Sequence, residues 1–170
     1  NLPGRAAGVC RPRSERACAA CARAGCAAGI PDTISAGKAN LTGSATPDGG
    51  VVLSMERMTS PEVQVDEAAQ FVRAPVGIIL EELREAVLAQ TDKRLYFPVD
   101  PTSRTDAFVG GALACNASGF IPGDKGAMRS WVESIDFMFP NGLKLAARRG
   151  EYVSEAGEFV ITWPEGVSGE

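Results

Sequence analysis

Two loops built almost entirely from small residues constrain this chain more than any other feature. The larger one begins at Asp100-Pro101-Thr102-Ser103 and continues in a run of Gly, Ala, Ser and Asn from Val109 to Gly119. The other runs from Ser35 to Gly43, directly after a short apolar segment. Runs that are too apolar for a solvated linker and lack side-chain bulk indicate backbone that lies close against a partner. Two such loops predict an elongated ligand held at two places.

The order of three motifs resembles a known family. The first motif, at residues 37–43, is a glycine, two further residues and then Asn-Leu-Thr-Gly. The second, at residues 97–103, is Phe-Pro-x-Asp-Pro-Thr-Ser. The third, at residues 110–119, is Gly-Gly-x-x-x-Cys-Asn-Ala-Ser-Gly. From about residue 11 to about residue 149 the chain is similar to the PCMH-type FAD-binding domain of vanillyl-alcohol-oxidase-type flavoproteins. Within that group it most resembles the branch of FAD-linked D-lactate, glycolate and D-2-hydroxyglutarate dehydrogenases.

The resemblance implies an α+β fold of two lobes with FAD between them. We expect a small α/β lobe over residues 1–58 and a second FAD-binding lobe over residues 59–170, with a mainly antiparallel sheet and flanking helices. The boundary is expected near Met58-Thr59-Ser60-Pro61. The resemblance also implies that the second lobe is incomplete, and that a substrate or cap domain is absent from the chain.

Residue patterns predict the individual elements. Ser14 is a suitable N-cap for an Ala-rich helix that Gly29 would stop. A second helix is expected to begin at Gly77 and to bury Ile79, Leu80, Leu83, Val87 and Leu88. Asn141-Gly142 predicts a hairpin turn, because both residues tolerate positive φ. The expected helices and strands are 9–10, 15–28, 33–35, 51–54, two strands within 63–76, 77–88, 135–139, 143–145 and 159–162, with a short helix or turn at 128–132.

The resemblance implies which residues contact FAD. In the first loop, residues around the pyrophosphate would be Ala36, Gly37, Lys38, Ala39, Asn40 and Gly43. In the second, Asp100, Thr102 and Ser103 would lie near the pyrophosphate or ribityl chain, Gly110 and Gly111 close to the cofactor, and Asn116, Ser118 and Gly119 toward the flavin. Main-chain N–H groups in such turns can form an anion site, and hydroxyls suit the ribityl chain. Lys38 departs from the family pattern; it would either contact the pyrophosphate or point to solvent.

Other interpretations of these loops, and of the cysteines, do not involve FAD and remain open. The first loop could be an ordinary β-turn connection, and the second a turn followed by a buried helix. Cys10, Cys18, Cys21 and Cys26 include one C-x-x-C, the spacing used by zinc and iron–sulfur sites. They also lie mostly in the Ala-rich helix, where cysteine serves as a small buried residue. Packing is the favoured reading, and no metal ligand is assigned.

Composition excludes several classes of function. The chain has 170 residues, a net charge of −4 and no long basic run, which argues against a nucleic-acid partner. No apolar stretch approaches the length of a membrane span, and the five cysteines suit a reducing compartment. We therefore expect a cytoplasmic protein. Because the chain has no histidine, it lacks the usual attachment point for flavin, and any FAD is expected to be non-covalent.

Three functions follow as hypotheses. The first is a flavin-dependent dehydrogenase that oxidises a 2-hydroxy acid of the D-lactate or glycolate type by hydride transfer to flavin N5. Its electron acceptor would be a protein or a quinone, and its catalytic residues would come mostly from another domain, so none is named. The second is an FAD electron-transfer subunit or a reductase on the same fold. The third is a metal-binding or structural protein that uses the cysteines.

Overall fold

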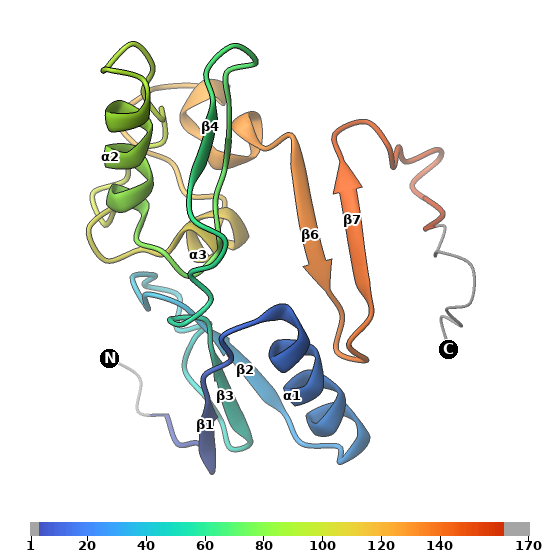
Figure 1. The fold of residues 1–170 in the computed structure, drawn as a ribbon. Coiled ribbons are helices and arrows are strands. Elements are labelled where there is room, and N and C mark those ends of the chain that lie inside the picture. The colour runs from blue at the N-terminus through green and yellow to red at the C-terminus, as the bar shows by residue number, and fades with distance from the viewer. Residues whose placement is uncertain (1–3, 162–170) are drawn as a thin grey trace.

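The computed structural model describes residues 4–161 and contains two groups of elements (Figure 1). The first group is a three-stranded parallel sheet with one covering helix. The strand order is β1-β3-β2, and Val51–Ser54 is the central strand, paired with both neighbours. The elements are β1 (Gly8–Cys10), α1 (Glu15–Ala27), β2 (Asp32–Ser35) and β3 (Val51–Ser54). The expected α/β character of this part is confirmed.

Helix α1 begins and ends where capping residues allow. Ser14 is extended, and its Oγ accepts a hydrogen bond from Ala17 N at 3.2 Å, so it acts as the expected N-cap. The helix ends one residue earlier than predicted, and Gly29 follows with a φ of 62°. Its buried face consists of Cys18, Ala19 and Ala22, and small side chains there let α1 lie close to β3.

The second group packs around a single apolar cluster. Helix α2 contributes Leu80, Leu83 and Val87, all nearly inaccessible, and these meet residues of the following loop and helix. The other buried members are Val99, Ala112 and Met128. The elements are β4 (Gln64–Asp66), β5 (Phe71–Arg73), α2 (Leu80–Gln90), α3 (Val109–Ala114), the 3₁₀ turns η1 (Asp124–Gly126) and η2 (Met128–Trp131), β6 (Ser134–Met138) and β7 (Lys144–Arg148).

The strands of the second group form two small sheets. The pairs β4–β5 and β6–β7 are both antiparallel, as expected, but within residues 4–161 they are separate two-stranded sheets. The predicted strand at 159–162 is wrong for Phe159–Ile161, which have no strand structure, while Thr162 lies outside the described residues. The start of β7 is one residue later than predicted, and the strand continues to Arg148.

The prediction that a helix begins at Gly77 is also wrong, because α2 starts at Leu80. Gly77 N instead donates a hydrogen bond of 2.9 Å to Met58 O. A Cβ on Gly77 would lie 2.3 Å from Met55 O. Gly77 is therefore a contact between the two groups of elements, and only glycine fits there.

The β6–β7 hairpin turn differs in type from the prediction. Of the turn residues, Gly142 has a positive φ of 77° and Asn141 does not. Phe139 N donates to Leu143 O and Gly142 N donates to Phe139 O, both at 2.8 Å. This is a three-residue loop that ends in a left-handed glycine, rather than a two-residue turn with two positive φ angles.

The tip of this hairpin lies on helix α1 (Figure 1). A Cβ on Gly142 would lie 2.6 Å from Arg23 Cγ and 3.1 Å from Ala19 O. Lys144 Nζ is 2.9 Å from Glu15 Oε2 of α1 and 2.9 Å from Asp136 Oδ2 of β6. Hydrogen bonds to Asp136 and then Glu15 raise the pKa of Lys144 above its ordinary value. The hairpin is thus a second connection between the groups.

Candidate functional site

The two small-residue loops meet in the structure. Gly37, just after β2, is so close to the second loop that a Cβ there would lie 1.9 Å from Asp106 O. A Cβ on Gly111, in the first turn of α3, would lie 3.1 Å from Ala36 Cβ. The absence of side chains at both glycines therefore brings together segments about seventy positions apart in the sequence. The predicted juxtaposition of the loops is present.

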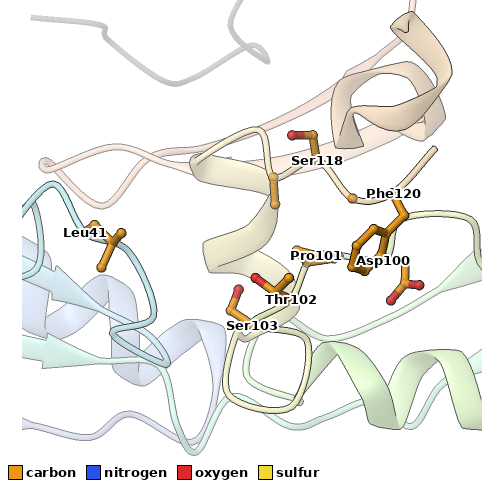
Figure 2. Close-up of a pocket in the computed structure, with 9 residues that line it drawn as sticks. Leu41, Asp100, Pro101, Thr102, Ser103, Ser118 and Phe120 are labelled. Carbon is orange, nitrogen blue, oxygen red and sulfur yellow. The ribbon is translucent and has the colours of Figure 1, made fainter. Parts of the chain in front are cut away.

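A cleft of about 560 Å³ opens beside this contact. Figure 2 shows Leu41 of the first loop on one side, Phe120 and Asp100 on the other, and Thr102 and Ser103 between them. The complete lining is Leu41, Asp100, Pro101, Thr102, Ser103, Ala117, Ser118, Gly119 and Phe120. The cleft thus combines hydroxyl groups with two exposed apolar side chains at its ends.

Main-chain N–H groups around the cleft are unpaired. Across the described chain, the N–H groups of residues 36–42 donate no intramolecular hydrogen bond, and the same holds for Thr102, Ser103 and Ser118. Ser35, at the base of the first loop, is fully buried, and its Oγ has no partner among the residues described. The N–H groups of these exposed and half-exposed residues are free to donate to water or to a ligand, and of the groups named here only the Ser35 hydroxyl is both buried and without a partner in the described chain.

The carboxylate of Asp100 is committed to protein partners. Its Oδ1 is 2.5 Å from Arg84 Nη1 of α2 and 3.1 Å from Arg104 Nη1. Arg104 Nε is in turn 2.8 Å from Glu81 Oε2. A Cβ on Gly119 would lie 2.4 Å from the carbonyl carbon of Asp100, so the two walls of the cleft touch at this residue. Two arginines therefore neutralise the charge of Asp100 at the wall of the cleft.

The predicted site residues fall into two sets. Five of them line the cleft: Asp100, Thr102, Ser103, Ser118 and Gly119. The other nine are not part of its lining, namely Ala36, Gly37, Lys38, Ala39, Asn40, Gly43, Gly110, Gly111 and Asn116.

Several residues of the second set have evident local roles. A Cβ on Gly110 would lie 2.7 Å from Val76 Cβ, so this glycine lets α3 pack closely against the segment before α2. Asn116 has a φ of 47°, and its Oδ1 accepts a hydrogen bond from Arg129 N at 3.0 Å, which holds η2. Asn40 Nδ2 donates to Ser44 Oγ at 2.9 Å, within the first loop. Lys38 is exposed, has a φ of 56°, and forms no ion pair with any residue in 4–161.

Four cleft residues were not predicted: Leu41, Pro101, Ala117 and Phe120. Leu41 and Phe120 are large apolar side chains within small-residue loops, and they fit no helix or strand periodicity. That mismatch was the available signal, because an apolar residue with no core to enter is a candidate ligand contact. Leu41 is fully exposed and Phe120 is 72% exposed.

The cysteines lie outside the cleft. All five are free, and burial raises the pKa of the Cys18 thiol. The pKa of Cys21 is raised by burial and then by a hydrogen bond with Cys10. In the described part of the chain, no three His, Cys, Asp or Glu residues are grouped so that they could hold a metal ion. The metal hypothesis gains no support from this geometry.

Between residues 4 and 161, no helix combines the length and apolar character that crossing a membrane requires.

A cleft with free N–H groups and hydroxyls, formed where two small-residue loops meet, fits a domain that binds a nucleotide cofactor. The sequence pattern of the family described as "FAD binding domain" matches residues 6–146. The chain therefore belongs to the FAD-binding domain family of FAD-linked oxidoreductases, and FAD is its cofactor.

Similar proteins agree with this membership. A D-lactate dehydrogenase from Archaeoglobus fulgidus is 36% identical over 114 residues, which cover 66% of this chain and 24% of that protein. A D-2-hydroxyglutarate dehydrogenase from Xanthomonas citri pv. viticola is 30% identical over 109 residues, covering 64% of this chain and 22% of that one. The chain thus spans about a quarter of the length of these curated relatives.

The fold is also found in solved structures. Glucooligosaccharide oxidase from Acremonium strictum, described with a 6-S-cysteinyl, 8α-N1-histidyl FAD, superposes with a TM-score of 0.73 at 21% identity. The superposition covers 86% of this chain and 30% of that one. At this identity the likeness concerns the fold alone. It confirms the predicted α+β FAD-binding architecture.

Proposed function

We propose that this chain is the FAD-binding part of a flavin-dependent dehydrogenase that oxidises a 2-hydroxy acid of the D-lactate or glycolate type. The observation that carries the proposal is the meeting of the two small-residue loops at Gly37 and Gly111, beside a cleft with unpaired N–H groups. The names of the two curated relatives support the substrate class.

We assign the pyrophosphate of FAD to the first loop. The free N–H groups of residues 36–42 supply several donors on one short segment, and Lys38 is a cation with no ion-pair partner in the described chain. A pyrophosphate removed from water needs such donors and charge. Thr102, Ser103 and Ser118 supply hydroxyl and N–H groups for the ribityl chain across the cleft.

The chain's own residues hold and orient the cofactor, while the redox chemistry is the cofactor's. FAD supplies, at N5, an acceptor for the hydride on the substrate carbon that carries the hydroxyl. We name no catalytic residue in this chain. FAD is proposed to be non-covalent, since the chain has no histidine to attach it.

The lobes are proposed to divide at residues 58 and 59. The last strand of the parallel sheet ends at Ser54, and Gly77 returns to contact Met55 and Met58. Residues 1–58 would then form the small lobe and 59–170 the second. The free cysteines favour a reducing compartment such as the cytoplasm.

The test is anaerobic reduction of the FAD-loaded protein. D-lactate, glycolate and D-2-hydroxyglutarate are added separately, and the visible flavin bands are followed. Bleaching by one of them supports the proposal, and its electron acceptor, a protein or a quinone, is then sought by reoxidation. If NADH bleaches the flavin and no hydroxy acid does, the reductase or electron-transfer function replaces it. A protein that takes up no FAD and instead holds zinc or iron would support the cysteine-based alternative.

A further inference from the structure

Four charged side chains join helix α2 to the wall of the cleft. Glu81 and Arg84 come from the first turns of α2, and Asp100 and Arg104 from the loop that lines the cleft. Arg84 and Arg104 both contact Asp100 Oδ1, and both lie near Glu81 Oε2, Arg104 at 2.8 Å and Arg84 at 3.7 Å. We call these four residues the charge quartet. Its two positive and two negative charges alternate, so it is neutral as a whole.

The charge quartet is shielded more than the other ion pairs described. Its side chains are 22% exposed at Arg84, 29% at Asp100, 32% at Glu81 and 35% at Arg104. By comparison, the side chains of the Arg94 and Glu67 pair are 64% and 38% exposed. Ion pairs gain strength as water is excluded, and removing one partner leaves the other charge uncompensated. The quartet is therefore the pairing that a substitution should disturb most.

Main-chain bonds fix only the later part of the cleft loop. The first N–H groups of α2 donate to it: Leu80 N to Ala107 O at 2.8 Å, and Glu81 N to Arg104 O at 3.1 Å. Among the described residues, positions 100–103 have no main-chain hydrogen bond to α2. Val99 and Pro101 are both buried, so Asp100 lies between two buried residues. The side chain of Asp100 ties this part of the loop to α2 through Arg84.

The charge quartet also neutralises a negative charge at the cleft. Asp100 lines the cleft, and an unpaired carboxylate there would repel the negatively charged pyrophosphate of FAD. Two arginines on the same carboxylate oxygen remove that repulsion. Position and charge therefore depend on the same contacts.

We propose that Glu81, Arg84 and Arg104 are positioning residues for FAD that act through Asp100. They hold residues 100–103 so that their N–H and hydroxyl groups face the cofactor, and they keep the Asp100 carboxylate from opposing the pyrophosphate. This inference rests on the proposed cofactor cleft and extends it to residues that do not touch the cofactor.

The experiment measures the dissociation constant of FAD for matched variants of the protein by flavin fluorescence titration. Arg84→Met is expected to weaken FAD binding about tenfold, the equivalent of ~1.4 kcal/mol, because it removes one of the two arginines that neutralise and hold Asp100. Arg84→Lys restores part of the charge pairing and should recover part of the loss. Arg94→Met is the control, because it removes an arginine ion pair outside the cleft and should leave FAD binding unchanged.

A double variant separates the charge role from simple damage. In Arg84→Met/Asp100→Asn the carboxylate that had lost one of its two arginines is gone, so FAD binding should recover part of the loss, and the part that remains measures the positioning role. If Arg84 only supported the fold, the double variant would bind FAD as weakly as Arg84→Met or more weakly. That result, or an Arg84→Met variant that binds FAD as well as Arg94→Met, overturns the proposal.

A measurement without FAD tests the positioning directly. Amide hydrogen exchange is followed at Arg104, Asp106 and Ala107, whose N–H groups bond to Pro101 O and Ser103 O. Arg84→Met should speed their exchange several-fold while the core amides of α2 stay protected. Unchanged exchange contradicts the positioning role. If the unaltered protein binds no FAD, the proposed function fails, and the exchange data still decide whether the quartet orders the loop.

Discussion

Gly37 lies against the main chain of Asp106 so closely that a Cβ on residue 37 would be 1.9 Å from the Asp106 oxygen. The contact joins the end of a parallel strand in one group of elements to the loop before α3 in the other. It is a backbone-to-backbone approach, so no side-chain movement could relieve a substitution. The cleft beside it depends on this closeness.

Gly37→Ala should therefore separate the two loops. We expect destabilisation of about 1–3 kcal/mol from overpacking and a loss of FAD affinity of at least about tenfold. Gly8→Ala is the matched control, because a Cβ there meets nothing within 4 Å and φ is not positive. Urea unfolding and FAD titration measure the two effects. A Gly37→Ala protein that binds FAD normally would show that the loops need not touch.

Lys38→Met tests the choice between a pyrophosphate contact and a solvent-facing side chain. We expect FAD affinity to fall about three- to tenfold, and its dependence on salt to weaken, because a charge-assisted contact is lost. Lys93→Met is a close control: Lys93 is also exposed and has a φ of 63°, compared with 56° for Lys38, but lies beyond the end of α2. Equal, unchanged affinity in both variants would place Lys38 in solvent.

Thr102→Val removes a cleft hydroxyl at nearly constant shape. The loss of one hydrogen bond to the ribityl chain should weaken FAD binding about threefold to tenfold, or ~0.5–1.5 kcal/mol. Thr105→Val is the comparison, because the Thr105 hydroxyl donates to Asp106 Oδ2 and does not line the cleft. Isothermal titration of FAD into both variants distinguishes them. An affinity equal to that of Thr105→Val would remove Thr102 from the proposed contacts.

The link between Lys144 and helix α1 should weaken at high pH. Because its pKa in the folded protein is raised from 10.5, Lys144 adds stability that is complete below that value and is lost as pH rises through the higher folded pKa. The side chain is 41% exposed, so we expect at most about 1 kcal/mol. The difference in unfolding free energy between the unaltered protein and Lys144→Met should shrink from pH 8 to pH 11.5. A constant difference would mean that packing of the lysine stem, not its charge, carries the effect.

Local patterns in the sequence predicted the regular elements well. Ser14 and Gly29 bound α1 because capping depends on a few neighbouring residues, and the apolar spacing of Leu80, Leu83 and Val87 identified the buried face of α2. The errors occurred where distant contacts overrule local preference. Gly77 was expected to begin a helix, but its N–H bonds to Met58, so the helix starts later.

The candidate site shows the same division. The sequence alone identifies the two small-residue loops and the motifs that resemble FAD-binding proteins. It does so because a close approach of backbone requires small residues, and residue size is known from the sequence. Which of those residues face the cleft cannot be read in this way. The Asn116 side chain accepts a hydrogen bond from Arg129 N, and Gly110 packs on Val76. The Asp100 carboxylate forms ion pairs with one arginine of α2 and one of its own loop. These outcomes depend on elements brought together only by folding, so tertiary structure alone decided which groups were left free for a cofactor.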